Sequence, residues 1–306
     1  MRPIGLLCFA MASAGVPTYA EEPAEIPAAL DRAAKEAAVQ VVNVRTDLDV
    51  ETPFGPITAK PTGSGLTKYA RLLSEEFALY PASLVRKARL RRLVLCSDLA
   101  FNGELRGAIP DYWHGDLYLD VVRGSASPPY QRTAIHHEFF HLVDYQDDGE
   151  VYRDDAWSAL NPIDFRYGPG GANVQDDPSG SLPNEKTRGF LTAYATSGVE
   201  EDKAEVFSRL IMIPREVERR SSADPIIWRK VARMKDMLKA FEPSVDEVFW
   251  KRIAERPDTP IGPVRSPAAP PPHPEAHFES MLGNGKSVEG TWDRSMISLI
   301  RATISG

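Results

Sequence analysis

The 306-residue sequence predicts an α+β fold that is mostly helical and contains a small sheet. Several segments carry apolar residues at the three- and four-residue spacing of amphipathic helices, and two shorter runs are rich in the branched residues typical of strands. The composition, 42% hydrophobic and 26% charged, is that of a globular chain with enough apolar surface for a real core. The length allows one large domain or two small ones.

The first third of the chain alternates helix and strand patterns. We expect an alanine-rich helix over residues 26–38 and a short strand in "VQVVNV" at residues 39–44. The stretch "TPFGPITAKPTGSG" is rich in proline and glycine, so we interpret it as a loop. A helix is then expected over residues 66–80, and a strand over "RLVLCSDLAF", which ends at the turn dipeptide Asn102-Gly103.

The middle of the chain predicts two short strands followed by a long helix. The strands lie in "GAIPDYWHGDLYLDVVRG"; we expect the second, residues 116–122, to be an edge strand that borders a helix at residues 129–145. Residues 146–189 have little regular pattern, and a loop of this length is usually functional or disordered. Beyond it, "EEDKAEVFSRLIMI" is an amphipathic helix, and "PIIWRKVARMKDMLKAFEPSVDEVFWKRIAE" predicts one or two more.

The N-terminus has the three-part pattern of a secretory signal peptide. Arg2 precedes an apolar run at residues 4–16, which is too short to span a bilayer, and small residues offer cleavage after Ala14 or Ala20. We therefore expect a secreted or periplasmic protein without a membrane span. Cleavage would leave Cys96 as the only cysteine, and its apolar neighbours indicate a buried thiol.

The chain divides into four regions on this interpretation. Residues 1–20 are the signal peptide, 21–62 an N-terminal helix and strand segment, 63–255 the main domain, and 256–306 a proline-rich linker and tail. The net charge of −7 argues against nucleic acid as a partner. The basic run "RKARLRRL" is interpreted as a solvated helix end that leads into a strand. Nothing in the sequence indicates the oligomeric state.

The stretch "HHEFFHLVDY" in the predicted central helix contains the pattern HExxH. His137 and His141 are four residues apart, so both imidazoles lie on one face of the helix and can bind one Zn²⁺. Glu138 follows the first histidine and can accept a proton from a water that the zinc activates. His136 is about 100° round the helix from His137, so we expect it to be an ordinary satisfied histidine.

A catalytic zinc needs a third protein ligand, and the sequence offers three carboxylates. Asp144 lies near the histidine face but is expected to orient a histidine rather than to bind the metal. Glu201 and Glu205 are four residues apart on the next amphipathic helix. One of them could bind the zinc while the other accepts the free N–H of a ligating histidine. The competing interpretation is a solvated acidic helix start, because Glu200, Glu201 and Asp202 suit a helix N-terminus.

Two blocks of the sequence resemble the zinc peptidases that are related to anthrax toxin lethal factor. "HEFFHLVDY" is similar to the motif helix of that family. "LTAYATSGVEEDKAEVFSRLI" is similar to its second block, in which a tyrosine stands seven residues before one glutamate and eleven before another. Those places are occupied here by Tyr194, Glu201 and Glu205. The resemblance also includes Phe207 and Arg209, and it extends over roughly residues 65–245.

The resemblance implies a zincin-like metallopeptidase domain of the gluzincin type. Carried over, His137, His141 and Glu201 would bind the zinc, Glu138 would be the general base, Glu205 would brace the site, and Tyr194 would donate to the oxyanion. The chain differs from the family in having Phe140 where a small residue is usual. It also differs in the insertion "WSALNPIDFRYGPGG", which is similar to exported bacterial peptidases of unknown substrate.

These features predict a secreted zinc-dependent endopeptidase that acts on a peptide or protein substrate. Trp157, Phe165 and Tyr167 in the insertion could line a pocket, although core packing suits each of them equally well. His114 could touch substrate, but a loop histidine without a role is the simpler interpretation. The alternative function is a secreted zinc-binding protein that acts by binding, with a fourth protein ligand closing the metal site.

Overall fold

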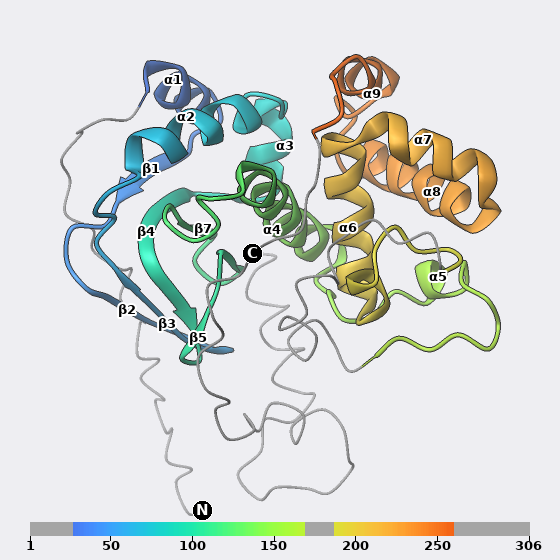
Figure 1. The fold of residues 1–306 in the computed structure, drawn as a ribbon, viewed down its shortest axis with the longest axis horizontal. Coiled ribbons are helices and arrows are strands. Elements are labelled where there is room, and N and C mark those ends of the chain that lie inside the picture. Colours follow the sequence, from blue (N-terminus) through green and yellow to red (C-terminus); the bar gives the residue numbers. More distant parts are fainter. Residues whose placement is uncertain (1–26, 169–186, 260–306) are drawn as a thin grey trace, which may run out of the picture. The chain divides into compact units, whose positions relative to one another are not determined.

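The computed structural model describes residues 27–168 and 187–259, which all belong to one compact unit (Figure 1). The predicted signal peptide at residues 1–20 and most of the proline-rich tail lie outside these ranges. Within them the chain forms nine α-helices and a seven-stranded mixed sheet, which confirms the predicted α+β class. No helix of the described ranges is long and apolar enough to cross a membrane.

The helices match the predicted pattern closely. In chain order they are α1 (Ala28–Glu36), α2 (Leu66–Phe77), α3 (Ala82–Lys87), α4 (Pro128–Asp148), α5 (Asp155–Ser158), α6 (Val199–Met212), α7 (Pro214–Ala223), α8 (Pro225–Phe241) and α9 (Glu247–Ala254). Helices α5 and α7 were not predicted, and α7 is the longer of the two. Helix α7 follows α6 after a single residue, and a proline at the first position of both α7 and α8 marks where each begins.

The longest strand organises the sheet. The strands are β1 (Gln40–Asn43), β2 (Leu48–Thr52), β3 (Gly55–Lys60), β4 (Arg92–Phe101), β5 (Glu104–Leu105), β6 (Ala108–Asp111) and β7 (Asp116–Asp120). The first half of β4 pairs in parallel with β1 and β7, and its second half pairs antiparallel with β3 and β5. Its N-terminal half therefore has a parallel neighbour on both sides, which explains why this half reads as a continuous apolar run.

The segment that we interpreted as a loop contains the turn and the second strand of a β-hairpin. Strands β2 and β3 pair from Leu48↔Ala59 to Thr52↔Gly55, and a two-residue turn joins them. Gly55 has a φ of +134°, a conformation that other residues rarely adopt. Pro53, Gly55, Pro56 and Pro61 belong to the turn and the strand ends, and Gly63 and Gly65 to the connection that leads into α2. Through β1, β2 and β3 the N-terminal segment thus contributes to the same sheet as β4.

The prediction that residues 116–122 form an edge strand is wrong. Strand β7 lies between β4 and β6 and is buried at every residue, whereas β6 ends the sheet order β2-β3-β4-β7-β6. Pro110 in β6 is the sequence signal for an edge strand. Proline has no backbone N–H, so it is tolerated in a strand where that N–H would face the open side of the sheet. The edge strand that borders α4 is therefore β6.

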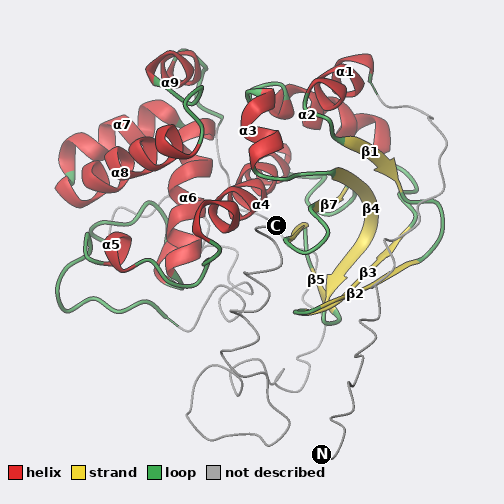
Figure 2. Ribbon diagram, turned by 180° about the vertical axis from the view of Figure 1, so that it is seen from behind, coloured by secondary structure: helices red, strands yellow, loops and turns green. Residues whose placement is uncertain are grey.

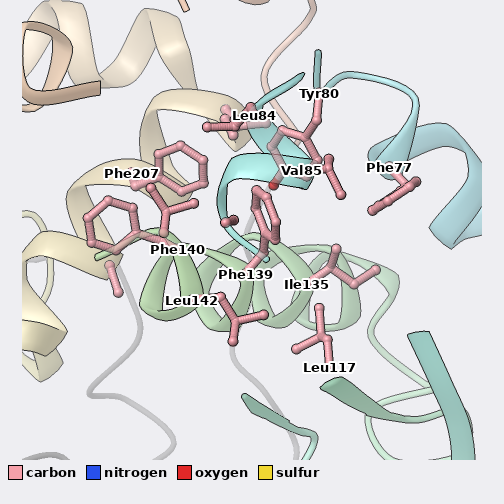
Figure 3. Close-up of a cluster of buried hydrophobic side chains, with 14 of the residues drawn as sticks. Phe77, Tyr80, Leu84, Val85, Leu117, Ile135, Phe139, Phe140, Leu142 and Phe207 are labelled. Atoms are coloured by element: carbon pink, nitrogen blue, oxygen red, sulfur yellow. The ribbon is translucent and has the colours of Figure 1, made fainter. Parts of the chain in front are cut away.

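The central helix α4 lies between the sheet and α6, with α5 and α7–α9 beyond α6 (Figures 1 and 2). The two phenylalanines of the HExxH motif, Phe139 and Phe140, belong to the buried core cluster (Figure 3). The Phe140 ring packs on Phe207 of α6 at 5.1 Å between centroids, and the Phe139 ring packs on Tyr80 at 4.5 Å. Phe140 thus packs between α4 and α6.

Candidate metal centre

Helix α4 places the two motif histidines side by side. His137 and His141 are one helical turn apart, and their ring centroids are separated by 4.9 Å. Both side chains are buried, with only 8% and 7% of their surface exposed. The four-residue spacing therefore produces the paired imidazoles that the sequence predicted.

Helix α6 brings a carboxylate to this pair. The Glu201 Oε2 atom lies 2.8 Å from His137 Nε2 and 3.8 Å from His141 Nε2. The acidic start of α6 is not solvated, because Glu200, Glu201 and Asp202 are all buried. The structure thus favours Glu201 as the partner of the histidines over the interpretation of an exposed acidic helix end.

The three side chains could hold a metal ion by geometry and by charge. Each offers one ligand atom, and these atoms lie within 4.8 Å of one another. Donors at about 2.1 Å from a tetrahedral zinc are separated by about 3.4 Å, a value between the two measured separations. Glu138, Glu201 and Glu205 also surround His137, and among the described residues only Glu205 forms an ion pair with an arginine. The excess of negative charge favours a bound cation.

Glu205 braces His137 from the opposite side. Its Oε1 accepts a hydrogen bond from His137 Nδ1 at 3.2 Å, which leaves Nε2 facing Glu201. Its Oε2 accepts from the buried Arg209 guanidinium at 2.8 Å. Although burial acts in the opposite direction, the charge of Arg209 and the hydrogen bond from His137 lower the pKa of Glu205 to about 2. The sequence did not decide which of the two glutamates could bind a metal. Glu201 faces the Nε2 atom of His137 and is the candidate ligand, whereas Glu205 holds the ring through Nδ1.

Tyr194 lies beside the same cluster. It begins a short 3₁₀ helix, η2 (Tyr194–Thr196), which packs on the start of α6. Its ring centroid is 5.9 Å from that of His137, and its hydroxyl donates a hydrogen bond to Glu201. The seven-residue spacing between Tyr194 and Glu201 thus brings a hydroxyl donor to the ligand carboxylate.

Glu138 is half-buried next to the histidine pair. Burial raises the pKa of its carboxyl to about 7, and the charge of His137 opposes the shift. A carboxylate with a pKa near neutrality can both accept and return a proton at physiological pH. This is the property that a general base in a hydrolase requires.

Asp144 lies elsewhere, and our expectation that it orients a histidine is not met. Its carboxylate pairs with Lys203 of α6 at 2.7 Å, and both side chains are buried. The Nδ1 atom of His141 is buried and has no hydrogen-bond partner among the residues that the structure describes. Asp144 therefore joins α4 to α6 through an ion pair. A buried lysine ammonium needs a carboxylate to compensate its charge, and Asp144 supplies it.

The two other histidines of the described ranges, His114 and His136, each have a partner of their own. His136 accepts or donates at both ring nitrogens, to the Tyr80 hydroxyl at 2.5 Å and to Glu76 at 3.0 Å, and it is fully buried. It is a satisfied core histidine, as predicted. His114 pairs with Asp111 at 2.7 Å within its own turn. Cys96 is buried, as predicted, and burial raises the pKa of its thiol.

A buried charged cluster attaches the insertion to the back of α6. Asp202, which follows Glu201, accepts hydrogen bonds from Trp157 Nε1 at 2.8 Å and from the Tyr167 hydroxyl at 2.6 Å, and it pairs with Lys230 of α8 at 2.7 Å. Trp157 is fully buried, so it anchors the insertion and does not line a pocket. Periodicity did not identify Lys203 or Lys230, because each reads as one more polar residue of an amphipathic helix.

Comparison with models of protein families, with curated proteins and with solved structures found no match to this chain.

Proposed function

We propose that this protein is a zinc-dependent endopeptidase in which His137, His141 and Glu201 bind the metal. The observation that carries the proposal is the convergence of three ligand atoms from α4 and α6, which lie within 4.8 Å of one another. Three protein ligands leave a tetrahedral zinc with one open position, as in catalytic sites. The resemblance of the two sequence blocks to the lethal factor-like peptidases agrees with this assignment.

The residues around the ligands supply the other parts of a hydrolytic mechanism. A zinc ion, when bound, supplies Lewis-acid polarisation of the scissile carbonyl and a lowered pKa for water. Glu138 accepts the proton of the attacking water and returns it to the leaving amine. Tyr194 donates a hydrogen bond to the oxygen that becomes negatively charged, and its existing bond to Glu201 supports its being within reach. Glu205 keeps the His137 ring in the orientation that the ligand role needs.

The substrate of such an enzyme is an extended peptide. Strand β6 ends the sheet order and borders α4, so a peptide could add to its free edge as a further strand. The scissile bond would then pass over the face of α4 that carries the histidines. The exported location remains a proposal that rests on residues 1–20, which lie outside the described ranges.

The alternative is a zinc-binding protein without catalysis, which requires a fourth protein ligand in place of water. The two candidates for that ligand have other partners. Asp144 pairs with Lys203, and Glu205 pairs with Arg209 and with the Nδ1 atom of His137. These contacts favour the enzyme over the closed site.

The substitution Glu138→Gln tests the proposal, because it removes the base and keeps the shape of the side chain. We expect the variant to bind as much zinc as the wild type and to hydrolyse a denatured protein at least about a hundredfold more slowly. Glu75→Gln, an exposed glutamate of α2, is the matched control and should keep full activity. Wild-type rates in the Glu138→Gln variant would remove Glu138 from the mechanism.

A further inference from the structure

An aromatic surface continues the face of α4 that carries the motif histidines. Tyr145 is four residues after His141 and eight after His137, so it lies on the same side of the helix. The ring of Tyr112, at the end of the edge strand β6, packs on Tyr145 at 4.9 Å between centroids. The Tyr112–Tyr145 pair thus closes the space between the edge strand and the helix one turn beyond His141.

Two exposed aromatic side chains extend this pair towards solvent. Phe54 in the turn of the β2–β3 hairpin meets the Tyr112 ring edge-on at 6.1 Å, and 41% of its surface is exposed. Tyr152, which follows α4, is 55% exposed. We call Phe54, Tyr112, Tyr145 and Tyr152 the aromatic surface. Large aromatic groups left in contact with water next to a functional site usually receive an apolar partner.

The ring contact of Tyr112 with Tyr145 brings Tyr112 near the candidate metal centre, and the charges around its hydroxyl agree with this position. Burial is the main reason that the pKa of Tyr112 is raised, and the charges of Tyr152, Glu138 and Glu201 add to the shift. The Tyr112 ring therefore lies close enough to Glu138 and Glu201 for their charges to act on its hydroxyl.

We propose that the aromatic surface is a specificity subsite, which takes an aromatic or branched aliphatic side chain of the peptide substrate. The inference rests on the proposed peptidase function. One helical turn separates Tyr145 from His141, about 6 Å along the axis. An extended peptide advances about 3.3 Å per residue. The selected side chain is therefore about two residues from the scissile bond.

The test is a set of peptides in which each of three positions on either side of the scissile bond is varied. The wild type should cleave peptides with Phe, Tyr or Leu at one of these positions about tenfold or more faster, as kcat/KM, than those with Gly or Asp. The double variant Phe54→Ser/Tyr152→Ser should reduce this preference by about tenfold. Trp228→Ser removes an aromatic residue of similar exposure from α8 and should leave the preference unchanged.

A binding measurement separates this inference from the proposed function. Calorimetry of the zinc-loaded Glu138→Gln protein should show the preferred Phe peptide binding about tenfold more tightly than its Gly counterpart, and the double variant should remove the difference. If the preferred peptide binds more tightly but the wild type hydrolyses none of the peptides, the binding subsite is supported and the peptidase function is refuted. Hydrolysis without an apolar preference, or a preference that survives the double variant, would overturn the subsite and leave the peptidase standing.

Discussion

The buried pair of Lys230 and Asp202 allows a stability prediction that is independent of any metal. The Lys230 side chain is fully buried, and its ammonium contacts the Asp202 carboxylate at 2.7 Å, the Gly189 carbonyl at 2.7 Å and the Phe190 ring at 3.7 Å from its centroid. The substitution Lys230→Met keeps most of the volume and removes the charge. It leaves Asp202 buried without its only cationic partner among the described contacts.

The magnitude follows from the burial of both partners. Breaking a fully buried ion pair by removing one side costs about 3–5 kcal/mol, because the remaining charge is left uncompensated. We therefore expect Lys230→Met to lower the free energy of unfolding by about that amount, measured by urea denaturation of the metal-free protein. Lys239→Met, an exposed lysine two turns later in α8, should change it by less than about 0.5 kcal/mol.

A double-mutant cycle isolates the charge from the packing. The variant Asp202→Asn/Lys230→Met keeps an acceptor for Trp157 and Tyr167 and no longer buries a charge. It should regain at least about 1 kcal/mol over Lys230→Met, since contacting residues couple by about 0.5–3 kcal/mol. If Lys230→Met were as stable as the wild type, or the double variant no better than the single one, the assignment of this pair as a buried ionic anchor would be refuted.

Two further predictions concern the ligands and their support. Glu201→Ala should abolish stoichiometric zinc binding, whereas Glu200→Ala should retain it, and equal zinc content in the two variants would move the third ligand elsewhere. Arg209→Met should weaken zinc affinity by about 10–100-fold in a competition titration, because Glu205 would lose the group that fixes it against His137. Arg219→Met on α7 is the control, and an effect there of the same size would show that the loss at Arg209 is not specific.

Much of the site could be predicted because its spacing is local. His137 and His141 are four residues apart, so both lie on one face of α4. Glu201 and Glu205 are also four residues apart, so both lie on one face of α6. Spacing did not decide which glutamate faces the histidines. The contact between α4 and α6 decides it, since Glu201 meets the Nε2 atoms and Glu205 meets Nδ1 of His137.

The features that could not be predicted are one ion pair between distant residues and the pairing of two sets of consecutive strands. Asp144 looked available to a histidine, but Lys203, 59 residues later, takes its charge. The β2–β3 hairpin was missed because prolines and a glycine at its strand ends outweigh a short alternating pattern. Strand β7 looked like an edge until β6 was seen to pair beyond it. In each case the outcome depends on a partner that the pattern of the segment itself does not identify.

X-ray absorption at the zinc edge of the metal-loaded protein tests the central claim most directly. We predict one zinc per chain with four ligands at about 2.0–2.2 Å, two of them imidazole nitrogens and the others oxygens. His141→Ala should remove one imidazole from this shell. Protein that retains no zinc, or a shell without imidazole that is unchanged in His141→Ala, would contradict the assignment of His137, His141 and Glu201 as a metal site.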